Sequence, residues 1–215
     1  MNNRMCEMFG IDVPIFAFSH CRDVVVEVSK AGGLGVLGMA RVNPKRLHEE
    51  LRWIDEHIDG KPYGIDVLMP MTYDDSGKRK HDEFATLLPR EQVEFVRDML
   101  DRAGIPRLPE GEEQRLMQEM VDAHNFTPEE SLKVIDAAME HPIKLIVNAL
   151  GTPPKHLVEK AHARGIKVAA LAGKPKHAVR HKAAGCDFVV AVGTEAAGHT
   201  GDITSMVLWP DIVDA

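Results

Sequence analysis

Six short apolar runs alternate with amphipathic segments along the chain, and this alternation limits the possible folds more than any other feature. The runs lie at residues 13–18, 34–39, 63–68, 143–147, 167–171 and 186–192. Within the last run, residues 188–192 have no polar alternation and are rich in β-branched residues, which is typical of a strand buried on both faces. Strands that alternate with helices form parallel βα units, so the sequence predicts an open doubly wound sheet or a (β/α)8 barrel.

The segments between the runs have the start and stop signals of helices. Apolar residues recur every three or four positions in residues 22–31, which indicates one buried helical face. Pro44 and Pro175 mark first helical positions, where proline is well tolerated. Gly165 and Gly185 follow two further segments, as expected just past a helix end.

The alternation of apolar runs and amphipathic segments is interrupted in residues 71–141, a charged stretch with helix-like pieces and no convincing strand. We interpret it as a helical insertion after the third strand. Its last helix has a clear start, with Thr127 as the N-cap, Pro128 at the first position and Glu130 in the capping box. The sequence therefore predicts one domain over residues 1–215 that contains this insertion, whose role as lid, dimer surface or substrate wall stays open.

The number of strands predicts an incomplete barrel. A closed (β/α)8 barrel needs eight strands, whereas six are visible here, and residues 203–215 have the pattern of a helix after the sixth strand. We therefore expect a partial barrel of six βα units, truncated before strands seven and eight. Its first and sixth strands would then form unpaired edges.

Composition and charge exclude several classes of function. The net charge is −7 without a basic cluster, which argues against nucleic-acid and anionic-membrane binding. The three cysteines, Cys6, Cys21 and Cys186, are widely spaced, so neither a disulfide framework nor a zinc ribbon is indicated. Because no apolar segment reaches about 20 residues and the start lacks a signal-peptide core, we expect a cytoplasmic protein that acts on small molecules or binds proteins.

A glycine motif at residues 33–38 matches the GxGxxG fingerprint of dinucleotide-binding sites. That fingerprint must follow a strand and open a helix, whereas here a helix precedes it and the next helix starts only at Pro44. We therefore interpret these glycines as part of a tightly packed strand.

Three histidines lie at positions where they could bind a metal ion or contact a substrate. His177 and His181 are four residues apart in a predicted helix, a spacing that suits a metal pair. Positive neighbours surround them and no acidic third ligand is near, so we interpret this segment as a solvated basic face and predict no metal site. His20 directly follows the first strand. The sequence does not decide whether this histidine contacts substrate or only packs against neighbouring residues.

In both candidate folds, ligands bind where the strands end. The loops at 17–20, 39–41, 68–70, 148–152, 171–174 and 193–202 would therefore share one face of the protein. The last of these contains three glycines, two alanines and His199. Small residues let a flat ligand approach the backbone, and histidine changes charge near neutral pH. This combination suggests a cofactor with a base beside it.

With these loops in order, the chain resembles the nitronate monooxygenase family of FMN-dependent (β/α)8-barrel enzymes. Four stretches carry the resemblance: 14–18, 29–38, 61–67 and 195–202. In the family the last stretch usually reads Glu-Ala-Gly-Gly-His-x-Gly and its histidine is the catalytic base, so the resemblance implies that role for His199. It also implies that FMN is bound by Ala17, Phe18, Asp66, Leu171, Ala172, Val192, Ala196 and Gly198.

Two residues depart from the family pattern. Ala197 stands where the family usually has glycine, and Asp66 stands where many members have asparagine. The extra methyl group could crowd the flavin, and a charged carboxylate cannot donate the hydrogen bond that an amide donates.

The resemblance implies a flavin-dependent oxidoreductase that converts alkyl nitronates and O2 into a carbonyl compound and nitrite. It leaves a homodimer open as the assembly. One alternative within the same fold is an NAD(P)H-dependent FMN reductase of the enoyl-ACP reductase or quinone reductase type. A second alternative is a non-catalytic barrel fragment that acts through association.

Overall fold

The computed structural model describes residues 3–40, 42, 44–69, 89–109, 111, 112, 115, 116, 128–198 and 200–215. The chain divides into two compact units, one formed by Met1–Met71 with Asn125–Ala215 and the other by Thr72–His124.

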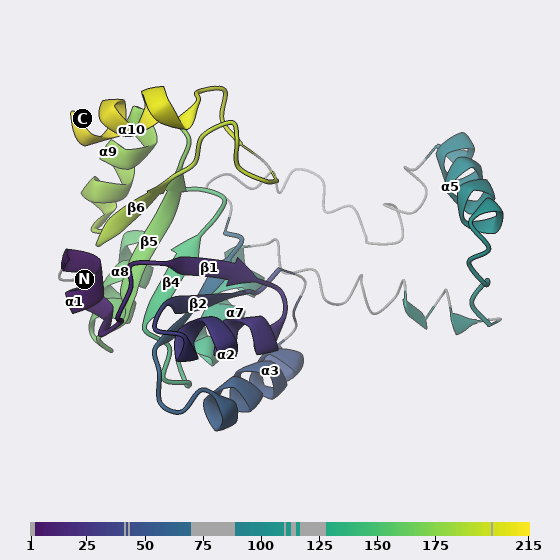
Figure 1. The fold of residues 1–215 in the computed structure, drawn as a ribbon, viewed down its shortest axis with the longest axis horizontal. Coiled ribbons are helices and arrows are strands. Elements are labelled where there is room, and N and C mark those ends of the chain that lie inside the picture. Colours follow the sequence, from purple (N-terminus) through teal and green to yellow (C-terminus); the bar gives the residue numbers. More distant parts are fainter. Residues whose placement is uncertain are drawn as a thin grey trace. The chain divides into compact units, whose positions relative to one another are not determined.

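The first unit is built on a parallel sheet whose strands follow one another in sequence order (Figure 1). Its strands are β1 (Phe16–Ser19), β2 (Leu34–Gly38), β3 (Tyr63–Val67), β4 (Leu145–Asn148), β5 (Lys167–Ala172) and β6 (Phe188–Ala191). Every neighbouring pair is parallel. The predicted partial barrel of six βα units is thus confirmed, with β1 and β6 at its edges.

Helices connect the strands and cover the outer face of the sheet. They are α2 (Arg22–Lys30), α3 (Pro44–His57), α7 (Pro128–Ala138), α8 (Lys155–His162), α9 (Pro175–Ala184) and α10 (Ser205–Val213). Helix α2 packs on β2, α8 and α9 pack on β5, and α10 packs on β6. The expected helix after the sixth strand is therefore present. Among the described helices, none is both long enough and apolar enough to cross a membrane.

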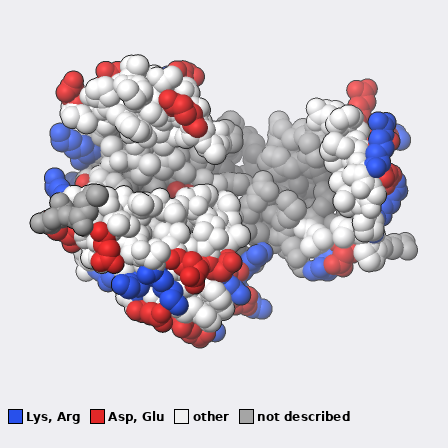
Figure 2. All heavy atoms as spheres, in the orientation of Figure 1, with Lys and Arg blue, Asp and Glu red and all other residues white. Residues whose placement is uncertain are grey.

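Mixed charges cover the solvent side of α2 and α3 (Figure 2). Arg22 pairs with Glu50 at 3.3 Å, and Lys30 pairs with Asp59 at 3.0 Å. Such exposed pairs each stabilise the fold by only about 0 to 1 kcal/mol. The opposite sides of both helices are apolar and pack toward the sheet, so the main stabilisation there comes from burial.

Two hydrophobic cores lie on opposite faces of the sheet. The outer core joins the sheet to α2, α3, α7 and α8, with Leu51 of α3 and Ile135 of α7 fully buried. The inner core joins the sheet to an N-terminal helix, α1 (Arg4–Phe9). The Phe9 ring lies 5.3 Å from the ring of Phe16 and 6.0 Å from that of Phe188, so α1 bridges the two edge strands on the inner face.

The sequence interpretation had not identified α1, although its capping signals are present. The Asn3 side chain accepts hydrogen bonds from the backbone N–H groups of Met5 and Cys6, both at 3.0 Å. Gly10 ends the helix in the left-handed region, with φ of 66°, where glycine carries no steric cost. Asn3 and Gly10 enclose only six residues, which is too short for helical periodicity to be visible.

The glycine motif of residues 33–38 belongs to a packed strand, as predicted. A Cβ atom at Gly35 would lie 2.3 Å from the backbone oxygen of Val25 in α2. Glycine at this position therefore lets α2 lie directly on β2, which is a packing function and not a phosphate-binding one.

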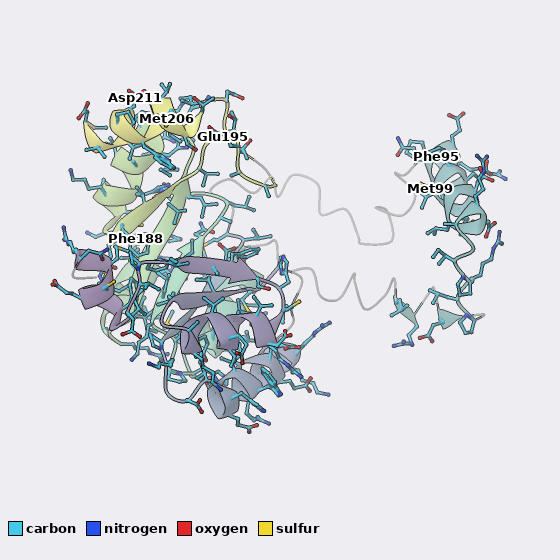
Figure 3. All side chains as sticks on the ribbon, in the orientation of Figure 1. Phe95, Met99, Phe188, Glu195, Met206 and Asp211 are labelled. Atoms are coloured by element: carbon cyan, nitrogen blue, oxygen red, sulfur yellow. The ribbon has the colours of Figure 1, made fainter. Side chains whose placement is uncertain are left out.

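In the second unit, the structure describes one long helix, α5 (Arg90–Arg102), in which no residue is buried. Phe95 and Met99 lie one turn apart on it (Figure 3) and are 67% and 50% exposed. The predicted insertion of residues 71–141 also included α7, but α7 packs on α3 and β3 of the first unit.

A chain of hydrogen bonds links β3, α3 and the segment after α7. The buried Tyr63 hydroxyl donates to Asp55 Oδ1 at 2.6 Å, and His141 Nδ1 lies 2.6 Å from Asp55 Oδ2. His141 Nε2 in turn lies 2.9 Å from His48 Nδ1. Burial and the Asp55 carboxylate raise the pKa of Tyr63 well above its usual value, so its hydroxyl stays a donor. Asp55 is therefore the acceptor on which the chain depends.

We expect Asp55→Ala to lower the free energy of unfolding by about 2 to 3 kcal/mol, because a buried hydroxyl and an imidazole lose their common acceptor. Urea denaturation followed by circular dichroism measures this change. Glu56→Ala, on the exposed side of the same helix, is the control and should cost less than about 0.5 kcal/mol. Equal losses in the two variants would contradict this account of the Asp55 network.

Candidate functional site

A cavity of about 1000 Å³ lies along the inner face of the sheet and reaches the loops at the carboxyl ends of the strands. Side chains from several strands converge on it, because parallel strands end at one edge. The residues that matter for ligand chemistry are Phe18, His20, Gly38, Asp66, Leu68, Leu171, Ala197, Gly198 and Trp209. Volume, apolar walls and a few polar groups together are typical of a small-molecule site.

Four of the predicted cofactor-binding residues line this cavity: Phe18, Asp66, Leu171 and Gly198. Ala17 and Ala172 alternate with them along β1 and β5 and are not among the lining residues. Successive side chains of a strand point to opposite faces, so any contact of Ala17 or Ala172 with a ligand in this cavity would be made by backbone.

The remaining predicted residues lie on or near the 193–202 loop. Val192 lines a second, smaller cavity together with Leu171. Ala196 is exposed and donates its N–H to the Gly193 oxygen at 3.1 Å. His199 lies outside the described residues, so its role as a base stays a prediction.

Asp66 is the ionisable residue on the inner face of β3. It pairs in register with Gly38 of β2, and it lies partly buried in the large cavity. Burial raises the pKa of its carboxyl group to about 7. Among the described residues, no side chain forms a hydrogen bond or an ion pair with this carboxyl group. Asp66 therefore exchanges its proton near neutral pH and has its hydrogen-bonding capacity available.

His20 also lines the large cavity, which the sequence interpretation had left undecided. Its ring packs edge-on against Phe18, with centroids 5.0 Å apart, and its Nδ1 lies 3.4 Å from the Gly38 oxygen. A Cβ atom at Gly38 would lie 2.7 Å from this ring. Glycine at position 38 thus leaves room for an imidazole at the cavity wall. The only sequence signal was its position directly after a strand.

The 193–202 loop is closed at its base by two sets of hydrogen bonds. Thr194 N–H donates to the Ile203 oxygen at 3.1 Å. Glu195 accepts from the backbone N–H of Ser205 at 3.0 Å and from its hydroxyl at 2.9 Å, at the start of α10 (Figure 3). The carboxylate of Glu195 therefore caps α10 and ties the loop to it. Gly198, with φ of 79°, adopts a left-handed conformation that favours glycine.

Asn148 connects the ends of β3 and β4. Its side-chain oxygen accepts from Met69 N–H at 2.9 Å, and its amide donates to the oxygens of Met69 at 3.0 Å and Gly151 at 2.9 Å. The side chain is 1% exposed. These bonds hold the loop after β4, which supplies walls to both cavities.

The second cavity, of about 330 Å³, is formed by the loops after β4, β5 and β6 together with α9. Lys174, His177, Arg180 and His181 line it. The prediction that His177 and His181 belong to a solvated basic face was wrong for His181, which is 2% exposed. No group of three potential metal ligands occurs among the described residues.

Comparison with known proteins matches this chain to one family. The family described as nitronate monooxygenase matches residues 2–215. A Mycobacterium tuberculosis protein with a provisional monooxygenase name, Rv1533, is 48% identical over 217 residues, which is 100% of this chain and 57% of that protein. A Staphylococcus haemolyticus protein, provisionally named a nitronate monooxygenase, is 26% identical over 229 residues, with 99% and 57% covered.

Two solved structures share the fold. FabK from Thermotoga maritima aligns with a TM-score of 0.67 at 18% identity, over 100% of this chain and 51% of its own. Nitroalkane oxidase from Streptomyces ansochromogenes aligns with a TM-score of 0.68 at 19% identity, over 98% and 57%. The chain therefore spans little more than half the length of the proteins that it matches. By the match over nearly all of its residues, the chain belongs to the nitronate monooxygenase family.

Proposed function

We propose that the protein is an FMN-dependent nitronate monooxygenase, which oxidises alkyl nitronates with O2 to a carbonyl compound and nitrite. The observation that carries this proposal is the large cavity at the carboxyl ends of the strands in a chain of this family. Because the chain spans little more than half of its relatives, the activity is proposed for the whole protein.

The walls of the large cavity suit a flat ring system. Several lining residues have small side chains or none: Gly38, Ala40, Ala149, Ala191, Ala197 and Gly198. A Cβ atom at Gly198 would meet no other atom within 4 Å, so the loop backbone borders open space there. We propose that Phe18, Asp66, Leu171 and Gly198, with the backbone of Ala17, Ala172, Val192 and Ala196, bind the flavin. When bound, the flavin supplies the redox chemistry.

Asp66 takes the place that asparagine has in many family members. With a pKa of about 7, its carboxyl group is largely protonated below neutral pH. A protonated carboxyl group donates a hydrogen bond, as an asparagine amide does. Asp66 would therefore replace asparagine as a donor in the cavity, without placing a full negative charge beside the ligand.

His199 is the proposed general base. An imidazole has an ordinary pKa of about 6.5, so near neutral pH it can take the α-proton from a neutral nitroalkane. General-base catalysis commonly contributes about 10²- to 10⁴-fold to a rate. A nitronate that is already deprotonated needs no such step, so the two substrates separate the role of the base from the rest of catalysis.

We expect His199→Asn in the flavin-loaded protein to reduce kcat/KM for 2-nitropropane by at least about 100-fold, and for its preformed nitronate by less than about tenfold. Nitrite release under air measures both reactions. His156→Asn, at an exposed position of α8, is the matched control and should change neither rate. An equal loss on the two substrates would refute the assignment of His199 as the base.

The reductase alternative is tested on the same sample. A monooxygenase of this kind should keep an oxidised flavin spectrum when NADH or NADPH is added without O2. Rapid anaerobic bleaching by either nucleotide would overturn the monooxygenase proposal in favour of a flavin reductase.

Asp66 should make stability fall as pH rises. Between the unfolded pKa of about 3.9 and the folded pKa of about 7, the folded protein holds a proton that the unfolded chain has released. Stability from this proton is thus complete at low pH and is lost as pH approaches 7.

In the parent protein the free energy of unfolding should decrease between about pH 5 and about pH 8, partly because Asp66 loses its proton. In Asp66→Asn we expect this decrease to be smaller by about 2 kcal/mol. Urea denaturation at the two pH values measures this difference. Asp211→Asn, at an exposed position of α10, should leave the pH dependence as in the parent protein. An unchanged pH dependence in Asp66→Asn would show that burial does not govern this carboxyl group.

A further inference from the structure

The second cavity has the features of a separate ligand site, and the proposed function uses only Leu171 and the backbone of Val192 from its lining. It lies at the ligand-binding edge of the sheet, where the loops after β4, β5 and β6 meet α9. Its volume of about 330 Å³ is within the range of small-molecule sites. It shares Ala149, Leu150 and Leu171 with the large cavity, so the two cavities are neighbours.

The charges around this cavity are positive. Lys174 and Arg180 line it, and no Asp or Glu does. Helix α9 is also the one helix in the described part of the chain whose residues include no Asp or Glu, although the chain as a whole carries a net charge of −7. The concentration of positive charge is therefore local, and it faces a cavity.

The two cations differ in how far their charge is neutralised. Lys174 Nζ lies 3.4 Å from Asp202 Oδ2, a carboxylate that is 90% exposed and therefore strongly screened by water. Arg180 forms no ion pair with a carboxylate of the described residues. Burial, followed by neighbouring positive charges that include those of Lys176, Arg180 and Lys174, lowers the pKa of His177. A bound anion would balance this excess of positive charge.

The walls of the cavity are fixed by buried hydrogen bonds. His181 Nε2 lies 3.0 Å from the Leu171 oxygen, and its Nδ1 lies 3.0 Å from Thr152 Oγ1. Because a carbonyl oxygen only accepts, Nε2 carries the proton, and Nδ1 accepts from the Thr152 hydroxyl. His181 thus joins α9 to β5 and to the loop after β4, and it is itself used as a structural group.

The loops after β5 and β6 also meet closely at this cavity. A Cβ atom at Gly201 would lie 2.8 Å from the Gly173 oxygen, so glycine at position 201 permits this contact. In addition, the side chain of Lys174, the N-cap residue of α9, forms no capping hydrogen bond. Pro175 has no N–H, and the His177 N–H donates to the Lys174 oxygen at 2.9 Å, so this helix end adds the positive end of its dipole to the charge of the side chains.

We propose that this cavity binds the phosphate group of a phosphorylated small molecule, with Arg180 and Lys174 as its ligands, at a site distinct from that of the flavin. Guanidinium presents a planar set of donors that matches phosphate oxygens, and an ammonium group adds a compact charge. The N-terminal end of α9 supplies Lys174 and His177 to the cavity wall, and the positive end of its dipole favours the same anion.

Titration of the full chain with inorganic phosphate, at constant ionic strength maintained with chloride, tests this proposal. We expect saturable binding by calorimetry or by amide chemical shifts of α9. Arg180→Gln and Lys174→Gln should each weaken binding by about tenfold or more, the loss of one charge-assisted hydrogen bond. Lys182→Gln removes the same charge from an exposed position of the same helix that does not line the cavity, and should change affinity by less than about twofold.

Asp202→Asn should change the affinity for phosphate in the opposite direction. Removal of the carboxylate that pairs with Lys174 should strengthen phosphate binding by about twofold to threefold. Absence of saturable binding, or equal weakening by Lys182→Gln and Arg180→Gln, would overturn the proposal.

A second arm of the experiment distinguishes two sources of the phosphate group. If the cavity takes a separate ligand, phosphate should bind equally well in the presence of saturating FMN or saturating riboflavin. If FMN blocks phosphate binding and riboflavin does not, the cavity holds the phosphate of the flavin itself, and the proposal of a distinct site is refuted. Neither result depends on nitronate turnover, so the outcome is independent of the proposed monooxygenase activity.

Discussion

The parallel pairing of consecutive strands is the constraint on which the rest of this structure depends. Each strand from β1 to β6 runs parallel to the next in sequence, so each strand starts at the edge opposite to the one where the previous strand ended and runs back to the carboxyl edge. All six carboxyl ends therefore meet at that edge, with the loops that follow them. Both cavities reach that edge: the larger one runs along the inner face of the sheet, and the smaller one lies among the loops after β4, β5 and β6.

The alternation of side chains along each strand decides which residues can act on a ligand. Phe18, Asp66 and Leu171 point to the inner face, whereas Ala17 and Ala172 fall on the other side of their strands. The same alternation places the Asp66 carboxyl group on a largely apolar wall, and burial then raises the pKa of this group. A carboxylic acid in that environment costs stability above neutral pH, which is a cost that functional sites commonly carry.

Much of the fold could be predicted from the sequence, because buried strands and capped helices are local patterns. The strands, the order of helices and the edge positions of β1 and β6 follow from apolar runs. Helix α1 was missed because Asn3 and Gly10 enclose too few residues to show a period. The second cavity was missed for a different reason: Arg180 of α9 and Thr152 of the loop after β4 are far apart in sequence, and only the fold brings them to one cavity. The roles expected at the large cavity rest on family resemblance, since no local pattern identifies a flavin-binding strand.

The hydrogen bonds at the loop edge separate structural groups from groups that are available to a ligand. Asn148 bonds to backbone groups at two loops, His181 bonds to a carbonyl oxygen and a hydroxyl, and Glu195 caps α10. Each is satisfied within the protein, so each fixes a wall. Asp66 and Arg180 have no such partner among the described residues, although each faces a cavity. Asp66 is partly buried, where an unpaired polar group is costly unless a ligand or water satisfies it. Arg180 is exposed to solvent, so its guanidinium is available to a ligand, and these two residues are where binding energy and ligand charge should be sought.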